Sequence, residues 1–540
     1  MGIHLLSSCQ GASATARVSI HLPHDPRRLV LLRRPKNKIA CSRGRIVGAS
    51  APALPPGPVP WPVVGNLPEM LLSKPAFRWI HRMMEDMGTD ITCVRLGSVH
   101  VIAILPQHRP RAAGTRTPCS RPSATPRAHL RRSSARPATR WLHDRRADEA
   151  DNLSRYVHTL ATGSASGVDV RHVARHYCGN VIRRLVFGRR YFGEPRPDGG
   201  PGLMEEEHMD AVFTSLGLLF AFCVSDYLPW LRGLDLDGHE KAVKEANTTV
   251  NRLHDTVIDE RWRQWKSGER RELDDFLDVL ITLKDAQGKP ALTIEEDIIL
   301  AATDNPSNAV EWALAEMANA PEVMAKAVEE MDRVVGRERL VQESDIPQLN
   351  YAKACIREAF RLHPEYTGER LVQESDIPQL NYAKACIREA FRLHPVAPFN
   401  LPHVALDDTT VAGYHVPKGS HVILSRIGLG RNPVIWEEPL LFKPERHINM
   451  AEGGDVVLTE NELRFISFST GRRGCIASSL GTDMCMMLFG RLIQGFTWSK
   501  PQGVAAINLS ESEHDLFLTK PLVLHAEPRL PVHLYSATDI

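Results

Sequence analysis

The most regular apolar pattern in the chain follows Cys475. Apolar side chains recur there at steps of three and four residues, which places them on one face of a helix. We therefore predict a buried helix that begins just after the cysteine, and the positive end of such a helix lowers the pKa of a nearby thiol. The positions are Leu480, Met484, Met487, Leu488, Leu492 and Ile493.

Patterns elsewhere predict a chain built mainly from helices, with few strands. We expect a helix from Lys74 to Met87 and a β-hairpin from Ile91 to Leu105 that turns at Gly97-Ser98. Amphipathic helices separated by turns rich in Gly and Pro are expected over 148–290. Strands are expected again around 404–422.

Composition agrees with one large globular domain. The chain has 540 residues, of which 43% are hydrophobic and 24% charged, enough to bury a sizeable core. Its formal net charge of +2 gives no argument for nucleic-acid binding. The ten cysteines are widely spaced and form no CxxC, a pattern that indicates neither a disulfide framework nor a zinc site.

Two segments do not fit this picture. Residues 1–53 form a basic leader that we expect to be disordered. It is either an organelle transit peptide or a leader without a specific function. Its apolar runs are far shorter than the roughly 20 residues of a membrane span. Residues 106–140 contain nine arginines, six prolines and no acid, so they cannot form a core. We interpret this segment as a solvated or artefactual insert, with an RNA-binding arm as the alternative.

The chain also contains an internal repeat. Residues 338–364 and 369–395 are identical over 27 positions, which indicates a recent duplication or an error in the gene structure. Each copy carries a Glu-x-x-Arg motif whose charges share one helix face, and Glu389 supplies the acid of the second copy. An isolated pair of this kind is usually a surface salt bridge of little value.

The loop before the helix predicted after Cys475 has the residue types of a haem ligand loop. A cysteine thiolate is one of the few protein ligands of haem iron, and Cys475 ends this loop. Gly471 and Gly474 permit tight turns and close approach to a flat ligand, while Arg473 can pair with a haem propionate. A lone cysteine before a helix would otherwise be interpreted as a free, buried residue.

The ten residues from Phe468 to Ala477 resemble the F-x-x-G-x-R-x-C-x-G signature of the cytochrome P-450 family. Phe468, Gly471, Arg473 and Cys475 match it, and Ala477 replaces the last glycine. The stretch resembles in particular the plant amino-acid N-monooxygenases, which convert tyrosine and related amino acids into aldoximes.

This resemblance implies a mainly α haem-thiolate monooxygenase fold with a small β region over 54–540. It implies haem b as cofactor, with Cys475 as the axial iron ligand, and O2, NADPH-cytochrome P-450 reductase and an L-amino acid, with tyrosine as the first choice, as partners. Nucleic acid is not an expected partner. The family resides at the endoplasmic reticulum membrane, although this sequence shows no anchor helix and only a membrane-surface contact is expected.

The resemblance also implies roles for other residues. Asp304 and Asn305 replace the acid-alcohol pair of the oxygen-binding helix, which Pro306 would kink over the haem; the alternative is an ordinary Asx-Pro helix start. Haem is expected between this helix and the Cys475 helix. The structural pair Glu389 and Arg392 should lock with Arg446, and the substrate pocket candidates are Phe399, Asn400 and Phe517.

Two other function classes remain open at this stage. In the family, the interval of the 106–140 insert carries a helix whose Trp and Arg hold a haem propionate, and this helix is not recognisable here. Its loss and the doubled segment fit an inactive or poorly folded product of a damaged gene. An arginine-rich nucleic-acid-binding protein is the more distant alternative.

Overall fold

The structure is a computed structural model. Residues 1–51 of the leader, 106–137 of the insert and the first repeat copy, 338–364, lie outside the residues it describes. Side chains are not described for 138–144, 219 and 297–304. The described residues are 52–105, 138–163, 167–194, 196–219, 221–282, 297–335, 377, 379–448, 456, 458, 464–469, 474–475, 477–512 and 515–535.

Helices make up most of the described chain, as the sequence patterns predict. They are α1 Leu67–Leu72, α2 Ala76–Met87, α4 Ala138–Gly163, α5 Val170–Phe187, α6 Leu203–Leu219, α7 Val224–Tyr227, α8 His239–Ser267, α9 Phe276–Thr282, α10 Asp297–Asn319, α11 Pro321–Val334, α13 Asn381–Leu393, α14 Arg426–Gly430 and α15 Ser478–Gly495.

The strands are short and form three small sheets, of four, three and two strands. They are β1 Ile91–Leu96, β2 Val99–Ile104, β3 Val168–Asp169, β4 His403–Val404, β5 Thr409–Val411, β6 Tyr414–Val416, β7 His421–Leu424, β8 Phe496–Ser499 and β9 Val523–Pro528. The prediction of a mainly α chain with a small β region is confirmed.

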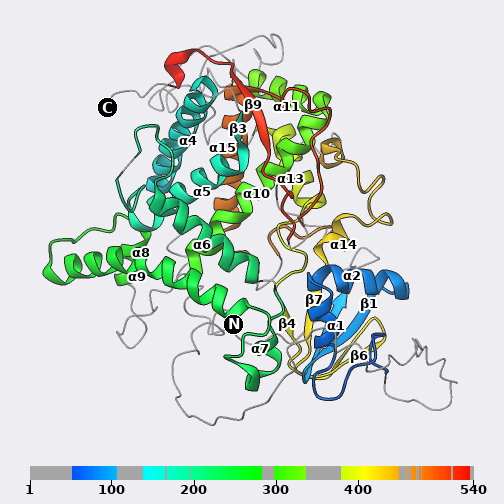
Figure 1. Ribbon diagram of the computed structural model, residues 1–540. Helices are drawn as coiled ribbons and strands as arrows, with labels where there is room; N and C mark the ends of the chain where they lie inside the picture. The colour runs from blue at the N-terminus through cyan, green and yellow to red at the C-terminus, as the bar shows by residue number, and fades with distance from the viewer. Residues whose placement is uncertain are drawn as a thin grey trace, which may run out of the picture.

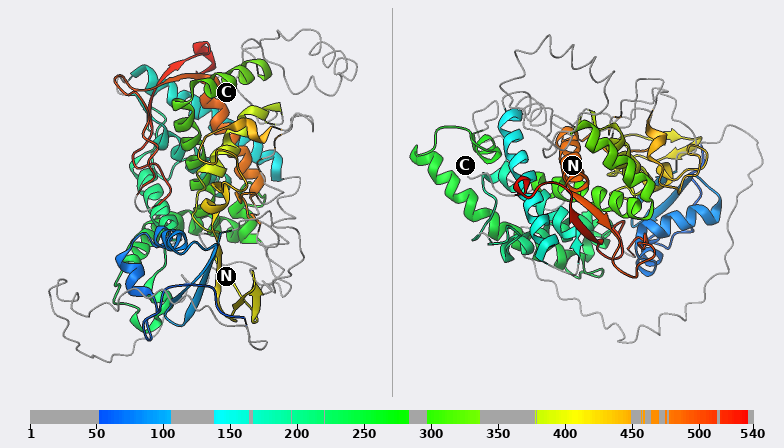
Figure 2. Two further views of the ribbon diagram at one scale, coloured as in Figure 1. Left: turned by 90° about the vertical axis from the view of Figure 1, so that its right-hand side faces the viewer. Right: turned by 90° about the horizontal axis from the view of Figure 1, so that it is seen from above.

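The largest sheet and the first two helices lie together at one end of the molecule, below the helical body (Figure 1). The strand order is β1-β2-β7-β4, with β1 antiparallel to β2 and β2 parallel to β7. The predicted hairpin and the predicted strands around 404–422 are therefore confirmed. Figure 2 shows the same division into a sheet end and a helical end from the side.

Helix α10 runs through the middle of the helical body and packs against α5, α13 and α15. Its Trp312 is fully buried, as are Met484, Leu488 and Phe489 of α15. The helix predicted after Cys475 is thus confirmed, and most of its apolar residues lie in the main hydrophobic core, between α4, α10, α11 and α13.

Two helix starts differ from expectation. Helix α2 begins at Ala76, because the residue before a proline is disfavoured in the helical region and Lys74 precedes Pro75. Helix α10 begins at Asp297 and continues through Pro306, so the alternative of a helix start at Asp304 is wrong. The last three residues of the predicted insert, 138–140, already belong to α4.

A buried acid joins α10 to α13. Glu316 Oε1 lies 2.7 Å from His394 Nε2, and the His394 ring stacks on Trp312 at a centroid distance of 3.7 Å. Burial and the nearby Glu389 carboxylate raise the pKa of Glu316 to about 7, against the opposing effect of Arg392 and Arg431. The carboxyl group is therefore held neutral well above its usual range.

This pKa predicts a pH dependence of stability. Between pH 4.5 and about 7 the folded chain holds a proton on Glu316 that the unfolded chain releases, so this contribution is complete below pH 4.5 and is lost as pH rises through 7. Glu316→Gln keeps a neutral hydrogen-bonding group and should remove the loss. We expect the variant to gain about 2 kcal/mol relative to wild type between pH 5.5 and pH 8 in denaturant unfolding. A difference that stays constant over this range would contradict the assignment.

Candidate active site

Cys475 stands at the entrance to α15, three residues before its first residue, Ser478. The Cys475 backbone N–H donates to the Phe468 carbonyl at 2.8 Å, which closes the loop between the two residues. The Cys475 side chain is exposed, whereas Cys485 inside α15 is buried. Gly474 is half-buried, and Gly471 and Arg473 lie outside the described residues.

Helix α13 packs against the segment that leads to Cys475. The Phe391 ring meets the Phe468 ring edge-on, with centroids 5.6 Å apart, and the Arg388 guanidinium lies over the Phe465 ring at 5.5 Å. Both α13 residues belong to the second repeat copy. That copy therefore packs directly against the segment that presents Cys475.

The structure brings Glu389, Arg392 and Arg446 together. Arg392 donates from Nε and one terminal nitrogen to the two Glu389 oxygens, both at 2.7 Å, and Arg446 Nε donates to Glu389 Oε1 at 2.9 Å. His447 Nε2 lies 2.7 Å from the other oxygen. Glu389 and Arg392 are fully buried.

The hydrogen bonds of this cluster stabilise the buried negative charge of Glu389. Burial alone would raise the pKa of Glu389, but the hydrogen bonds from Arg392 and His447 lower it to about 2. Arg392 also donates to the carbonyls of Gly430 and Pro439. The cluster thus ties α13 to α14 and to the irregular chain before Arg446.

The predicted oxygen-binding pair lies on α10. Asn305 is exposed, and the side chain of Asp304 is outside the described part. Pro306 sits inside the helix and cannot donate to the carbonyl one turn earlier. Asn308, one turn after Asp304, is 2% exposed, and neither of its amide atoms has a hydrogen-bond partner among the described residues. Sequence reasoning missed Asn308, since nothing in its spacing marks it.

The turn around Phe517 is fixed to α10. Trp312 Nε1 donates to the Leu516 carbonyl at 3.0 Å, and Arg171 bridges Glu311 at 2.8 Å and the Leu518 carbonyl at 2.7 Å. The Phe517 ring, half-buried between these anchors, lies 6.4 Å from the Phe213 ring of α6. The turn therefore brings α5, α6 and α10 to one place.

Phe399 and Asn400 lie next to the end of β7. Phe399 is 4% exposed and stacks on His81 with centroids 4.9 Å apart. The Asn400 side-chain oxygen accepts a hydrogen bond from the Leu424 N–H, at the end of β7. The Asn400 amide is therefore partly engaged in holding the strand, which its sequence position did not reveal.

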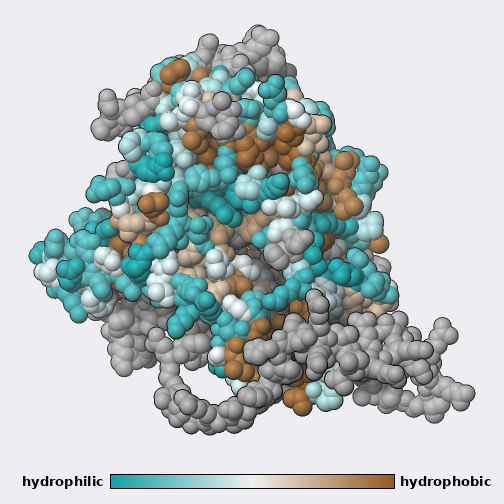
Figure 3. All heavy atoms as spheres, viewed as in Figure 1, coloured by the Kyte–Doolittle hydropathy of each residue, from teal (hydrophilic) through white to brown (hydrophobic). Residues whose placement is uncertain are grey.

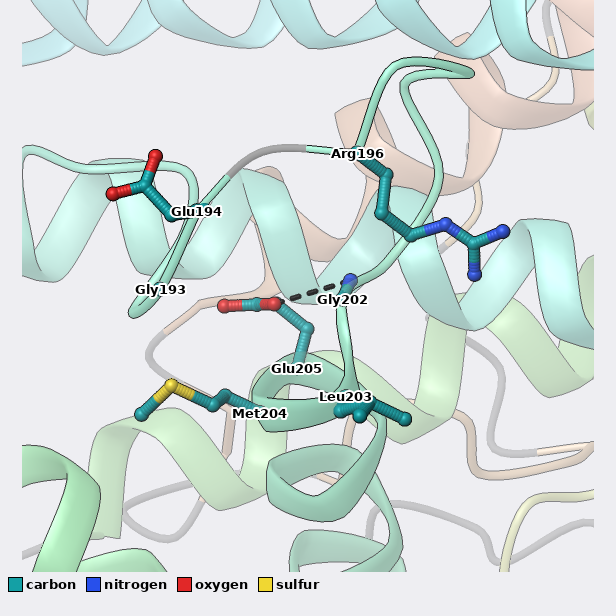
Figure 4. Close-up of a pocket in the computed structure, with 7 residues that line it drawn as sticks. All are labelled: Gly193, Glu194, Arg196, Gly202, Leu203, Met204 and Glu205. Carbon is teal, nitrogen blue, oxygen red and sulfur yellow. Dashed lines mark hydrogen bonds between the residues drawn. The ribbon is translucent and has the colours of Figure 1, made fainter.

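The pocket drawn in Figure 4 is separate from these residues. It lies between the loop before α6 and the first turn of that helix, and its acid, Glu205, accepts hydrogen bonds from the backbone N–H groups of Gly202 at 3.1 Å and Phe192 at 2.6 Å. Glu205 is 1% exposed and serves this loop locally.

Comparison with known proteins shows what kind of site this is. The family model for cytochrome P-450 matches residues 120–368 and 365–525, so each copy of the repeated segment falls in a separate match. The chain is 64% identical to tyrosine N-monooxygenase of Sorghum bicolor, over 94% of this chain and 93% of that protein. It is 50% identical to tryptophan N-monooxygenase 1 of Arabidopsis thaliana, over 90% of each, and 47% identical to valine N-monooxygenase 1 of Manihot esculenta, over 93% and 92%.

The chain belongs to the cytochrome P-450 family. It is therefore a haem-thiolate oxidoreductase, a monooxygenase that uses O2, a substrate and electrons from a redox partner. The residues present fit the haem. An exposed thiol stands at the start of a buried helix, and a buried arginine nitrogen near it, Arg426 Nε, has no partner among the described residues.

The position of Cys475 predicts the outcome of two cysteine substitutions. Cys475→Ser should abolish the far-red-shifted Soret band of the reduced carbon monoxide complex, because only a thiolate ligand produces it. Cys485→Ser should leave the band, since burial raises the pKa of Cys485 and keeps its thiol neutral within the core. Loss of the band in Cys485→Ser and its survival in Cys475→Ser would show that the ligand is assigned to the wrong cysteine.

Proposed function

We propose that this protein converts an L-amino acid, L-tyrosine first, into its aldoxime. The support is its 64% identity, over nearly the whole of both chains, to a tyrosine N-monooxygenase. Two hydroxylations of the amino nitrogen each insert one oxygen atom of O2 and reduce the other to water, with two electrons and two protons. Loss of carbon dioxide and water then leaves the aldoxime. The electrons would come from NADPH-cytochrome P-450 reductase.

Haem bound through Cys475 supplies the oxygen chemistry, and residues of α10 would orient the amino acid. Asp304 and Asn305 precede Pro306, where the helix lacks one backbone donor. A carboxylate and an amide at such a point can bind the substrate amine or pass protons from solvent. Phe517 would form the side of the pocket, with Phe399 and Asn400 at its edge.

A membrane surface contact belongs to the same proposal. None of the described helices is long and apolar enough to cross a membrane. Large apolar side chains are nevertheless exposed near the sheet end, where a few brown residues are visible beside the grey ones in the lower part of Figure 3. Lys74 Nζ, 3.4 Å from the Asp237 carbonyl, links the two segments that carry them. They are Val59, Trp61, Val63 and Leu72 in one segment and Trp230, Leu234 and Leu236 in the other. We place this surface on the endoplasmic reticulum membrane.

Turnover by the full chain together with its reductase tests the proposal. Microsomes that contain both proteins are supplied with NADPH and single amino acids, and aldoximes are measured by mass spectrometry. We expect the tyrosine aldoxime as the main product, with at least tenfold lower rates for phenylalanine, tryptophan and valine. Cys475→Ser should make none.

The carbon monoxide spectrum separates two kinds of failure. A normal thiolate spectrum with no amino acid consumed would overturn the proposed substrate class. A preference for another amino acid would overturn tyrosine alone. Absence of the spectrum would show that the chain does not hold haem, as expected of a damaged gene product.

A further inference from the structure

Arg426 is the first residue of α14 and its backbone is held firmly in place. Its N–H donates to the Pro398 carbonyl at 2.9 Å, and the N–H of the preceding residue, Ser425, donates to the Ile104 carbonyl at 2.9 Å. The Ser425 hydroxyl caps α14 by accepting from the Gly428 N–H at 2.8 Å. The backbone at Arg426 is therefore held between the end of β2 and the segment that carries Pro398 and Phe399.

The Arg426 side chain has an unmet requirement. Its Nε is buried and has no hydrogen-bond partner among the described residues, while the residue as a whole is only half-buried. A guanidinium withdrawn from water is costly unless it is paired. Arg431, one turn later, shows the contrast, because it donates to the Leu393 carbonyl at 2.9 Å and to the Glu511 carboxylate.

The Arg426 side chain interacts electrostatically with the haem ligand Cys475. Burial lowers the pKa of Arg426 to about 10, and Cys475 opposes that shift. The two side chains are 49 positions apart in sequence and within electrostatic range of each other. A planar guanidinium in this position suits a carboxylate that it can meet with two parallel N–H donors.

We propose that Arg426 binds a propionate of the haem. The inference rests on haem binding, not on the identity of the amino-acid substrate. Haem carries two propionates, and partly buried carboxylates need cationic partners. Arg473 is expected to pair with one of them, and Arg426 provides a second cation from a different element.

The other carboxylate available to this site is that of the amino acid. The haem is favoured because Arg426 interacts electrostatically with Cys475, the residue that would hold the haem iron, whereas the substrate is expected beside α10. A contact with the substrate carboxylate is the competing outcome of the test.

The test measures haem loss to apomyoglobin from the purified holoprotein. Arg426→Gln should lose haem at least tenfold faster than wild type, and Arg426→Lys, which keeps the charge but not the paired donors, at least threefold faster. Arg252→Gln is the control, because Arg252 forms an exposed pair with Glu207 on the surface. Should the glutamine variant yield too little folded protein, the lysine variant carries the same comparison. Rates within twofold of wild type in the tested variant would overturn the proposal.

Two further arms identify the carboxylate. Esterifying both propionates should speed the loss of haem from wild type. The acceleration should be at least fivefold smaller in Arg426→Gln, which already lacks the contact. Equal acceleration in both proteins would assign Arg426 a structural role only and overturn the proposal. Spectral titration of Arg426→Gln with tyrosine and with tyramine should give Kd values within threefold of those of wild type. A tenfold weaker tyrosine Kd with unchanged tyramine binding and unchanged haem loss would assign Arg426 to the substrate instead.

Discussion

One buried carboxylate, Glu389, organises the part of the chain that presents the haem ligand. It is fully buried and would be costly there without partners, yet Arg392, Arg446 and His447 all bind it. These partners come from its own helix and from a segment more than fifty residues later, so the ion cluster forms only when α13 and that segment are correctly placed. Removing one partner leaves the buried Glu389 charge less well compensated.

The consequences of this cluster reach Cys475 through aromatic rings. The His447 ring meets the Phe465 ring edge-on, with centroids 6.0 Å apart. Phe391, on α13 with Glu389, meets the Phe468 ring, and the Phe468 carbonyl accepts a hydrogen bond from the Cys475 N–H. At the C-terminal end of α13, the hydrogen bond between His394 and Glu316 joins this helix to α10. Helix α13 thus links the helix under which the substrate is expected to the loop that presents the thiolate.

Local patterns predicted the elements well, and contacts across the sequence much less so. The helix after Cys475 and the hairpin at Gly97 depend on periodicity and turn residues within a few positions, so they could be predicted. His447 stands next to Arg446 in the sequence, but nothing local shows that it faces a carboxylate 58 residues earlier. Arg426 lies between Ser425 and Ile427 and in no motif, so its buried Nε and its electrostatic interaction with Cys475 became visible only in three dimensions. The same holds for Asn308 and for the engagement of Asn400 with β7.

Glu389 and Arg392 belong to the second of two identical segments, and this copy has the structural role. Excising 338–368 leaves the same chain as excising 365–395, so only point substitutions distinguish the copies. The decisive measurement is the free energy of unfolding at pH 7 of Glu389→Gln beside Glu358→Gln, the same change in the first copy. We expect Glu389→Gln to lose about 3 kcal/mol, from the fall of its pKa from 4.5 to about 2. Glu358→Gln should stay within about 0.5 kcal/mol of wild type. An equal or larger loss in Glu358→Gln would contradict the account.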